Sequence, residues 1–436
     1  MNLNKIIKFY LFNSYHRPSA KLESIKALLR KLIYSKRTDL FSERSALLKR
    51  PIPTLEFYNS FGRIIFYLNC AITIILINKY PKNSHIQLDN SNNKRGKSNA
   101  INPIIPFHQL DTVNEDLDYE TLLNNYKKHL ETYSNLNGDS DWWIKCRNEF
   151  QNLFITKAGK LNNESLENFR SGSNASAAIL TDASRLLNRS HPKRWRRIQS
   201  LRHIMQYHEL AERIDKNILL VNSEASSGNP PKLCYRNVYI TQRSLRFSYY
   251  LSSLTNKLPK LLSNDPQIII DIGGAYGGLI RSLSHYCPKH TYILCELPET
   301  LLLADYFLND CFKNKSFLHI HDIDGLNTCN KSDLLKYDFI MITPDIFYNL
   351  KKPLIDLAIN TTSLCEMTPA AQQMYIDTIE RTSKYFYSVN RYGSRKDKFD
   401  TIGFSDLSFK NKWRPIKVDF THTYHLEFLG ENLGVV

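Results

Sequence analysis

Two carboxylates, Asp271 and Glu296, flank a cluster of glycines in the most distinctive stretch of the sequence. Asp271 directly follows the apolar run 268–270, and Glu296 directly follows a second apolar run, 292–295. The glycines between them are Gly273, Gly274, Gly277 and Gly278. Glycine lets a backbone approach a ligand closely, and a carboxylate at the tip of the next strand can accept both hydrogen bonds of a ribose diol. This pattern predicts a site for an adenosine-type ligand at the carboxyl edge of a parallel sheet.

Nicotinamide dinucleotides and S-adenosylmethionine both carry an adenosine group. The dinucleotide fingerprint G-x-G-x-x-G is met only loosely, by Gly273, Ala275 and Gly278, and its glycine logic gives the preceding acid no role. An acid there suits an amino acid with a positive amine and a sulfonium, but it would repel a pyrophosphate. The spacing favours S-adenosylmethionine, with a nicotinamide cofactor as the alternative. An ordinary strand-to-helix connection is the structural alternative, in which Glu296 only favours the next helix N-terminus.

These residues require a βαβα unit to position them. The runs at 268–270 and 292–295 are expected to form buried parallel strands. A helix is expected between them, because apolar residues at 279, 280, 283, 286 and 287 share one helical face before Pro288 ends the pattern. A second helix is expected to begin at Pro298.

Further apolar runs predict that the sheet continues. Short strands are expected at 317–321, 339–342, 357–359 and 385–390, and the tail 418–429 alternates like an edge strand or a hairpin. Helices are expected at 239–254 and at 369–381, the latter with Thr368 as its N-cap. The predicted fold class is α/β, a Rossmann-like sheet with a mostly helical N-terminal region.

Three motifs carry a resemblance to a known family. DIGGAYGGL at 271–279 and ELPETLLLADYFL at 296–308, followed by INTTSLCEM at 359–367, resemble the sugar O-methyltransferases of bacterial surface-polysaccharide and glycosylated-antibiotic gene clusters. The resemblance runs from about Gly228 to the C-terminus. It implies a Rossmann-like methyltransferase domain that uses S-adenosylmethionine to methylate a sugar hydroxyl.

One departure from that family falls within the glycine cluster. Where those proteins usually carry three consecutive glycines, the third position here is Ala275. Its methyl group would lie where the backbone passes closest to the cofactor. Weaker cofactor binding is expected unless φ at Ala275 stays negative, a backbone region that alanine tolerates. The cofactor-binding residues predicted are therefore Asp271, Gly273, Gly274, Ala275, Gly277 and Glu296.

The stretch 360–367 is where we expect the acceptor to be activated. A sugar hydroxyl is a poor nucleophile until a base removes its proton, and a positioned general base contributes roughly 10² to 10⁴ in rate. Glu366 is the first candidate for that base, and Asn360 and Ser363 are candidates for orienting the acceptor. Glu366 also has a structural alternative, because it lies near the N-terminus of the helix that begins at Pro369.

Two further sites are predicted at a strand end and in the tail. Asp322 could accept a hydrogen bond from the adenine amino group, although a turn with Asp324 and Gly325 explains it equally well. His422 or His425 could replace Glu366 as the base, because histidine titrates near neutral pH. No spacing of ligand residues indicates a metal site, and metal dependence is left open.

Several arginines lie near these motifs. One of Arg243 and Arg246, upstream of the glycine cluster, could pair with the cofactor's carboxylate. We expect both to be surface arginines instead. The basic loop 391–398 could meet a phosphorylated or lipid-pyrophosphate sugar carrier, or it could simply be solvated.

Composition indicates a globular protein whose basic charge is concentrated at one end. Of its 436 residues, 42% are hydrophobic and 12% aromatic, so a core can form without metal or disulfide staples. Residues 1–100 hold 18 Lys and Arg against 5 Asp and Glu, a net charge of +13 out of a total of +16. The eight cysteines form no CxxC pair, which predicts buried thiols in a reducing compartment. No cleavable signal sequence is evident, so the cytoplasm is expected.

The N-terminal region leaves the question of membrane contact open. The apolar segment 64–77 would span only about 21 Å as a helix, too short for a bilayer core of ~30 Å. A buried element is favoured over an interfacial anchor, but the basic stretch 5–50 keeps peripheral contact with the inner membrane face as an alternative. No nucleic-acid-binding module is recognisable.

The domain organisation predicted is a basic region with a linker at 1–100, a helical region at 101–227 and the Rossmann-like methyltransferase domain at 228–436. The function predicted is methyl transfer from S-adenosylmethionine to the hydroxyl of a small-molecule or lipid-linked sugar, and whether the acceptor is free, nucleotide-linked or lipid-linked is left open. A nicotinamide-dependent oxidoreductase and a non-catalytic, membrane-associated assembly protein are the two alternatives.

Overall fold

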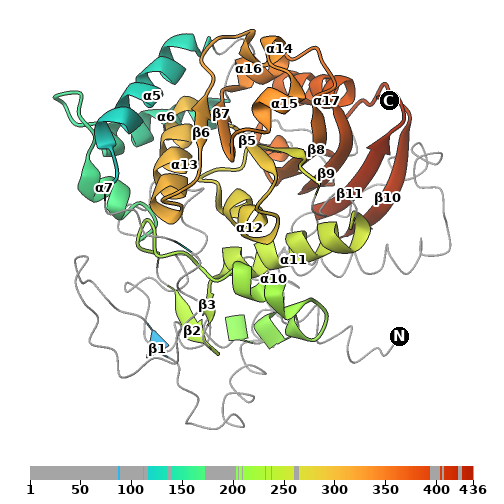
Figure 1. Cartoon of the computed structure of the whole chain (residues 1–436), viewed down its shortest axis with the longest axis horizontal. Coiled ribbons are helices and arrows are strands. Elements are labelled where there is room, and N and C mark those ends of the chain that lie inside the picture. Colours follow the sequence, from blue (N-terminus) through green and yellow to red (C-terminus); the bar gives the residue numbers. More distant parts are fainter. Residues whose placement is uncertain are drawn as a thin grey trace, which may run out of the picture.

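The computed structural model describes residues 87–88, 111, 116–134, 140–171, 203–204, 206–208, 210–230, 232–236, 238–259, 265–392, 403–404, 407–420 and 425–435. Apart from residues 87–88, the basic N-terminal region and its apolar segment 64–77 therefore lie outside the described residues, as does most of the loop 391–398. Figure 1 shows the arrangement of the described elements.

One eight-stranded sheet forms the centre of the molecule, in the order β10-β11-β9-β8-β4-β5-β7-β6. Its strands are β4 Ile268–Ile272, β5 Thr291–Cys295, β6 Phe317–His319, β7 Phe339–Ile342, β8 Ile355–Thr361, β9 Ser383–Arg391, β10 Trp413–Phe420 and β11 His425–Asn432. The strands from β6 to β9 pair in parallel. β11 runs antiparallel between β9 and β10. The strands predicted from apolar runs are thus confirmed, and the tail forms a hairpin.

The order of the strands shows a Rossmann-like sheet. From β4 the chain winds to one side through β5, β6 and β7, and it then returns past β4 to β8 and winds the other way, which makes the carboxyl ends of β4 and β8 a topological switch point. Every residue of β4 and β5 is buried, as expected for strands covered on both faces. The antiparallel hairpin completes one side of the sheet, and the predicted α/β, Rossmann-like fold class is confirmed.

Helices cover both faces of the sheet (Figure 1). The helices α11 Gln242–Lys257, α12 Gly278–Tyr286 and α13 Pro298–Cys311 share one apolar cluster with the strands. On the opposite face lie α14 Gly325–Thr328, α15 Lys331–Leu334, α16 Pro344–Tyr348 and α17 Pro369–Thr382, which share a second cluster. The predicted N-cap of α17 is confirmed, because the Thr368 hydroxyl accepts a hydrogen bond from the Ala371 N–H.

The helical region that precedes the sheet packs onto the same core. It contains α5 Tyr119–Thr132, α6 Asp141–Phe154, α7 Asn163–Glu167 and α10 Lys216–Val221. Leu122 of α5 and Phe150 of α6 belong to the apolar cluster that also holds Phe307 of α13. A smaller sheet of β1 Gln87–Leu88, β2 Leu233–Tyr235 and β3 Val238–Ile240 lies next to α10 (Figure 1). Because β3 pairs with β2, the helix predicted to begin at residue 239 begins at Gln242 instead.

Buried ion pairs tie this region to the sheet. Arg281 of α12 donates to both carboxylate oxygens of Asp111, at 2.7 and 2.8 Å, and to the Ser223 carbonyl at 3.0 Å. Within the helical region, Arg170 pairs with Glu224, and both side chains are buried. Removing one partner of a buried pair leaves an uncompensated charge, so the pair of Asp111 with Arg281 fixes the two parts of the chain together.

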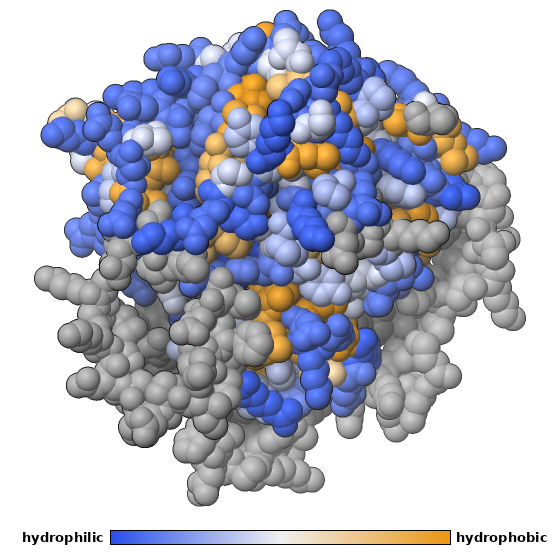
Figure 2. Space-filling view, viewed as in Figure 1, coloured by the Kyte–Doolittle hydropathy of each residue, from blue (hydrophilic) through white to orange (hydrophobic). Residues whose placement is uncertain are grey.

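The described residues contain no helix long and apolar enough to cross a membrane, and no group of three potential metal ligands. The seven described cysteines are all free thiols, and five of them are buried. In the view of Figure 2 the surface is mostly hydrophilic.

Candidate functional site

The glycine turn between β4 and α12 uses the left-handed backbone region three times. Gly273 has φ +69°, Ala275 has φ +53° and Gly277 has φ +82°. The Gly273 N–H donates to the Cys295 carbonyl at 3.0 Å, which fastens the turn to the end of β5. Gly277 is the N-cap of α12 and has no side chain to cap it. The sequence folds this way because glycine adopts positive φ without steric cost.

Asp271 is a buried carboxylate without a hydrogen-bond partner among the described residues. It is 1% exposed, and a Cβ added to Gly274 would lie 2.4 Å from its Oδ2 atom. Gly274 is therefore required so that the chain can pass the carboxylate. Burial raises the pKa of Asp271 to about 7. A buried acid in this state is strongly favoured to meet a cation or a hydrogen-bond donor.

Glu296 lies beside the same turn at the end of β5. Its Oε1 accepts a hydrogen bond from the Ala275 N–H at 2.6 Å, and its Oε2 accepts one from the Leu297 N–H at 3.1 Å. Burial raises the pKa of Glu296 to about 8, and the negative charges of Asp271 and Glu366 add to this rise. The structure thus brings three of the predicted acids within electrostatic range of one another.

Ala275 does not have the negative φ under which an alanine would be tolerated here. At φ +53° its side chain is strained, typically by about 1–2 kcal/mol. The same conformation directs its N–H to the Glu296 carboxylate. The condition under which the sequence analysis expected alanine to be tolerated is therefore not met, and weaker cofactor binding stays a prediction. The strain accompanies the contact between the Ala275 N–H and Glu296.

Asn360 and Ser363 lie on the other side of the glycine turn. The Ser363 hydroxyl is so close to Gly273 that an added Cβ would lie 1.8 Å from it. Asn360 is fully buried and donates to the Ile272 carbonyl at 2.7 Å and to the Ser363 hydroxyl at 3.2 Å. Its oxygen accepts from the Leu364 N–H at 3.1 Å. The Asn360 amide therefore contacts the end of β4, Ser363 and Leu364, and through these contacts it positions Ser363 and the end of β8.

Glu366 ends a short 3-10 turn, η2 Leu364–Glu366, that follows β8. Its side chain is exposed, while Leu364 and Cys365 of the same turn are buried. The Glu366 charge acts to raise the pKa of Glu296 and also that of Cys146 in α6. The Glu366 carboxylate therefore lies within electrostatic range of Glu296 and of Cys146 in α6. Its role as the base remains a prediction.

Asp322 follows β6, the edge strand of the sheet, and β7 separates that strand from β5. Asp322 is exposed, and its Oδ1 accepts a hydrogen bond from the Asp324 N–H at 3.2 Å, as the turn alternative predicted. The strand that flanks β5 is β7, and Asp345 follows it. Asp345 is 1% exposed, and its Oδ1 has no partner among the described residues. The sequence analysis did not select Asp345, because β6 follows β5 in the sequence whereas β7 lies beside β5 in the sheet.

The remaining predicted base lies outside the described residues. His422 falls in the segment 421–424, which separates β10 from β11. His425 begins β11 and pairs in register with Arg391 at the end of β9. His425 is thus near the carboxyl end of β9.

The expectation of surface arginines is wrong for Arg243. Its side chain is only 7% exposed, and its guanidinium lies over the ring of Tyr276 at 5.4 Å. The Nε atoms of Arg243 and Arg246 are buried without a hydrogen-bond partner in the described part of the chain. In the sequence, Arg243 and Arg246 are three residues apart and share a helix face with Tyr250, and this spacing could have indicated that the two arginines face the same surroundings.

The helices α5 and α6 are held on the same edge of the sheet by acids that follow β5 and β7. Arg147 of α6 pairs with Glu299 at 2.8 Å, and Gln151 donates to Glu299 at 2.8 Å. Ser134 donates to Asp345 Oδ2 through its N–H at 2.6 Å and its hydroxyl at 2.8 Å. These contacts place the end of α5 and one side of α6 beside the candidate site.

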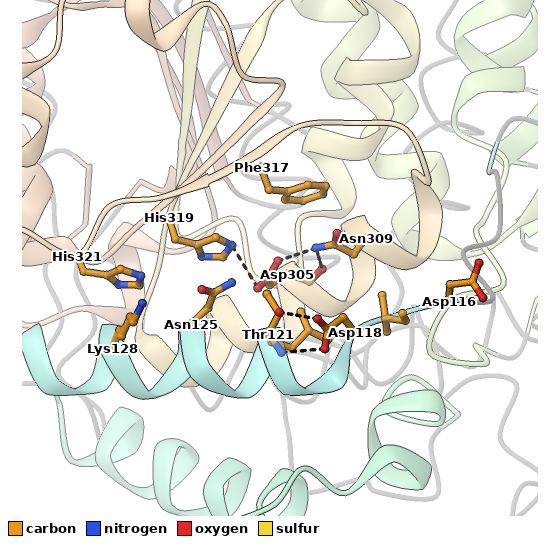
Figure 3. A pocket seen from close by; sticks show the side chains of 12 residues that line it. Asp116, Asp118, Thr121, Asn125, Lys128, Asp305, Asn309, Phe317, His319 and His321 are labelled. Carbon is orange, nitrogen blue, oxygen red and sulfur yellow. Dashed lines mark hydrogen bonds and ion pairs between the residues drawn. The ribbon is translucent and has the colours of Figure 1, made fainter.

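A separate cavity of about 470 Å³ lies between α5, α13 and β6 (Figure 3). Lys128 and Asn125 reach it from α5, Asp305 and Asn309 from α13, and His319 from β6. None of the predicted cofactor or catalytic residues lines it. We place the candidate site at the glycine turn instead, because Asp271, a buried acid without a hydrogen-bond partner among the described residues, is found there.

Comparisons with known proteins add little to this geometry. No protein-family model and no curated protein matches the chain. Among solved structures, the chain is similar to a candidate sarcosine dimethylglycine methyltransferase from Galdieria sulphuraria, with 12% identity, a TM-score of 0.24 and coverage of 34% of this chain and 45% of that one. It is also similar to a SAM dependent methyltransferase from Aquifex aeolicus, with 10% identity, a TM-score of 0.25 and coverage of 42% and 96%.

The chain thus spans less than half of the Galdieria protein. With TM-scores this low, the fold is assigned from the strand order described above.

Proposed function

We propose that this protein is an S-adenosylmethionine-dependent O-methyltransferase that acts on a sugar hydroxyl. The main support for this cofactor is the Asp271 carboxylate, which is buried beside Gly274 without a hydrogen-bond partner among the described residues. Together with Glu296 and Glu366 it gives the site three acids, whose ionised forms suit a ligand with an ammonium and a sulfonium. A dinucleotide would bring a negatively charged pyrophosphate to the same acids, so the nicotinamide alternative is disfavoured.

The residues present fit this cofactor. Asp271 is placed to meet a positive amine, and Glu296, whose two oxygens each hold only one backbone hydrogen bond, has acceptor capacity left for a ribose diol. The free Oδ1 of Asp345, at the end of the strand next to β5, is suited to a donor such as an adenine amino group. S-adenosylmethionine supplies an electrophilic methyl group when it is bound.

The acceptor chemistry is proposed for the turn η2. Glu366 would remove the proton from the sugar hydroxyl, and Ser363, held by Asn360, would orient that hydroxyl. Alignment of the hydroxyl with the methyl carbon supplies much of the rate enhancement in such a displacement. The sugar itself is supported only by the family resemblance of the three motifs.

Calorimetry with the full chain tests the cofactor. We expect heat on titration with S-adenosylmethionine and none with NAD⁺, and we expect Asp271→Asn to weaken binding by about 10- to 100-fold, as for a charge-assisted contact. Asp324→Asn, an exposed acid in the turn after β6, is the matched control. Heat with NAD⁺ alone would establish the oxidoreductase alternative.

Transfer of labelled methyl groups to glycan fractions then tests the reaction. Loss of transfer in Glu366→Gln, with cofactor affinity unchanged, supports the proposed base. Cofactor binding without transfer to any glycan would favour the non-catalytic alternative.

A further inference from the structure

Three arginines at the carboxyl edge of the sheet have no carboxylate partner among the described residues. Arg243, Arg246 and Arg391 are here called the arginine cluster. Arg243 is 7% exposed and Arg391 is 9% exposed. Each arginine has a buried nitrogen without a hydrogen-bond partner among the described residues. These nitrogens are Nε of Arg243, Nε of Arg246 and Nη1 of Arg391. A buried guanidinium without a counter-charge is strongly unfavourable, so a ligand is expected to supply one.

Arg391 is held against the turn that carries the proposed base. Its Nη2 donates to the Cys365 carbonyl at 2.5 Å, and Cys365 immediately precedes Glu366. The Cys365 N–H in turn donates to Asn390 Oδ1 at 3.4 Å. The orphaned Nη1 of Arg391 therefore lies on the acceptor side of the candidate site.

Tyr250 connects the other two arginines to the same place. It lies on α11 four residues after Arg246 and is 3% exposed. Burial raises the pKa of Tyr250, while the charges of Arg246 and Arg243 act to lower it and those of Glu427 and Cys365 act to raise it. Both arginines and Cys365 are thus within electrostatic range of one phenol, and the nearby Glu427 is already paired with Lys417. Arg243 also lies over Tyr276, a residue of the glycine turn.

No arginine of the cluster contacts the acid that is proposed to meet the cofactor's amine, because both carboxylate oxygens of Asp271 lack a hydrogen-bond partner among the described residues. The pKa of Asp271 is set by burial alone, whereas a cation within roughly 4–6 Å would lower it. In an amino acid the amine and the carboxylate are attached to the same carbon. An arginine that bound the cofactor's carboxylate would therefore lie close to Asp271, and its charge would be felt there.

We propose that the arginine cluster binds a negative group of the acceptor, a phosphate or a carboxylate, so that the acceptor is an anionic sugar. This inference rests on the proposed function. It divides the site into a negative half, made by Asp271 and Glu296, for the cationic cofactor and a positive half for the acceptor. Guanidinium groups are well suited to both candidate anions because they donate two parallel hydrogen bonds.

Direct binding tests the proposal without turnover. Inorganic phosphate, glucose 1-phosphate, glucuronate and the neutral methyl glucoside are titrated into the full chain. We expect the phosphate probes or glucuronate, but not methyl glucoside, to bind, and Arg391→Gln to weaken that binding by about 10- to 100-fold. Preference between the phosphate probes and glucuronate distinguishes the two anion sources.

Two further variants separate a specific effect from misfolding. Arg414→Gln removes an exposed guanidinium from the edge strand β10 and is expected to leave anion binding unchanged. Arg246→Gln, at a half-buried position, provides a second test if Arg391→Gln does not fold. In each folded variant the affinity for S-adenosylmethionine is expected to stay within about twofold of the original.

The outcomes are distinct from those of the proposed function. Equal binding of neutral and anionic sugars overturns the anionic acceptor, even if the cofactor binds normally. A tenfold loss of cofactor affinity in Arg391→Gln, with anion binding intact, also overturns it and assigns the arginine cluster to the cofactor's carboxylate. Failure to bind S-adenosylmethionine in the unchanged chain sinks the proposed function, while anion binding still reports on the arginine cluster.

Discussion

The protonation states of Asp271 and Glu296 depend on whether a cationic ligand lies beside them. Each has a pKa raised by burial, to about 7 and about 8, because the protein itself supplies no cation beside them. Their ionised forms are the ones that attract a cationic ligand, so each must lose its proton on binding. Cofactor binding is therefore expected to release protons and to weaken as pH falls.

The expected pH dependence can be measured by calorimetry. Between pH 7.5 and pH 5.5 the affinity for S-adenosylmethionine should fall by about tenfold or more, since Asp271 becomes protonated in the free protein over this window while Glu296 is already mostly protonated at its upper end. Titrations in buffers of different ionisation enthalpy should show proton release near pH 7. In Asp271→Asn the dependence should be shallower. An affinity that is constant across this range would contradict the assignment.

Ala275 is the second residue whose effect can be isolated. Replacement by glycine removes the strain of a positive φ, which outweighs the added freedom of the unfolded chain. We expect Ala275→Gly to raise the melting temperature by about 2–4 °C and to tighten cofactor binding, because the methyl group is lost from the turn.

Ala370→Gly, in α17, serves as the opposite control for Ala275→Gly. A helical alanine replaced by glycine should lower the melting temperature. A lower melting temperature in Ala275→Gly as well would show that the side chain at residue 275 is not strained.

At the level of whole elements, α6 is fastened to α13 through Arg147 and Glu299. Glu299 is only 2% exposed and has no other cationic partner among the described residues. Since α6 also passes near Glu366, the same contact keeps one wall of the candidate site in place.

Removing one partner of this pair should be costly. Arg147→Met leaves the Glu299 carboxylate buried with Gln151 as its remaining donor and should lower the free energy of unfolding by about 3 kcal/mol, measured by urea denaturation. Adding Glu299→Gln should recover much of the loss. If the two substitutions are simply additive, the ion pair does not hold the two helices together.

At the scale of the whole molecule, the sequence was sufficient to predict the strands and helices whose apolar residues have a strong periodicity. The strands at β4, β5, β7 and β8 are short apolar runs that end in turn residues, and a sheet covered on both faces explains them. The glycine turn was predicted from residue type alone, because positive φ and the close approach to Asp271 both select glycine.

The features missed from the sequence are those set by spatial order. Asp322 and Asp345 each follow an apolar strand, and only the insertion of β7 between β5 and β6 distinguishes them. Likewise, Arg243 lies on a helix of average polarity, and its burial depends on how α11 packs against the glycine turn. Pairing order and packing are long-range properties that local periodicity does not encode.

The ion pairs that join the first half of the chain to the sheet have a consequence for synthesis. Asp111 and Arg147 leave the ribosome well before their partners Arg281 and Glu299, and Arg147 can pair with Glu299 only after β4 and β5 exist. The nascent helices α5 and α6 therefore expose apolar faces until the second half is translated. Such a chain is expected to need chaperones during translation more than after release.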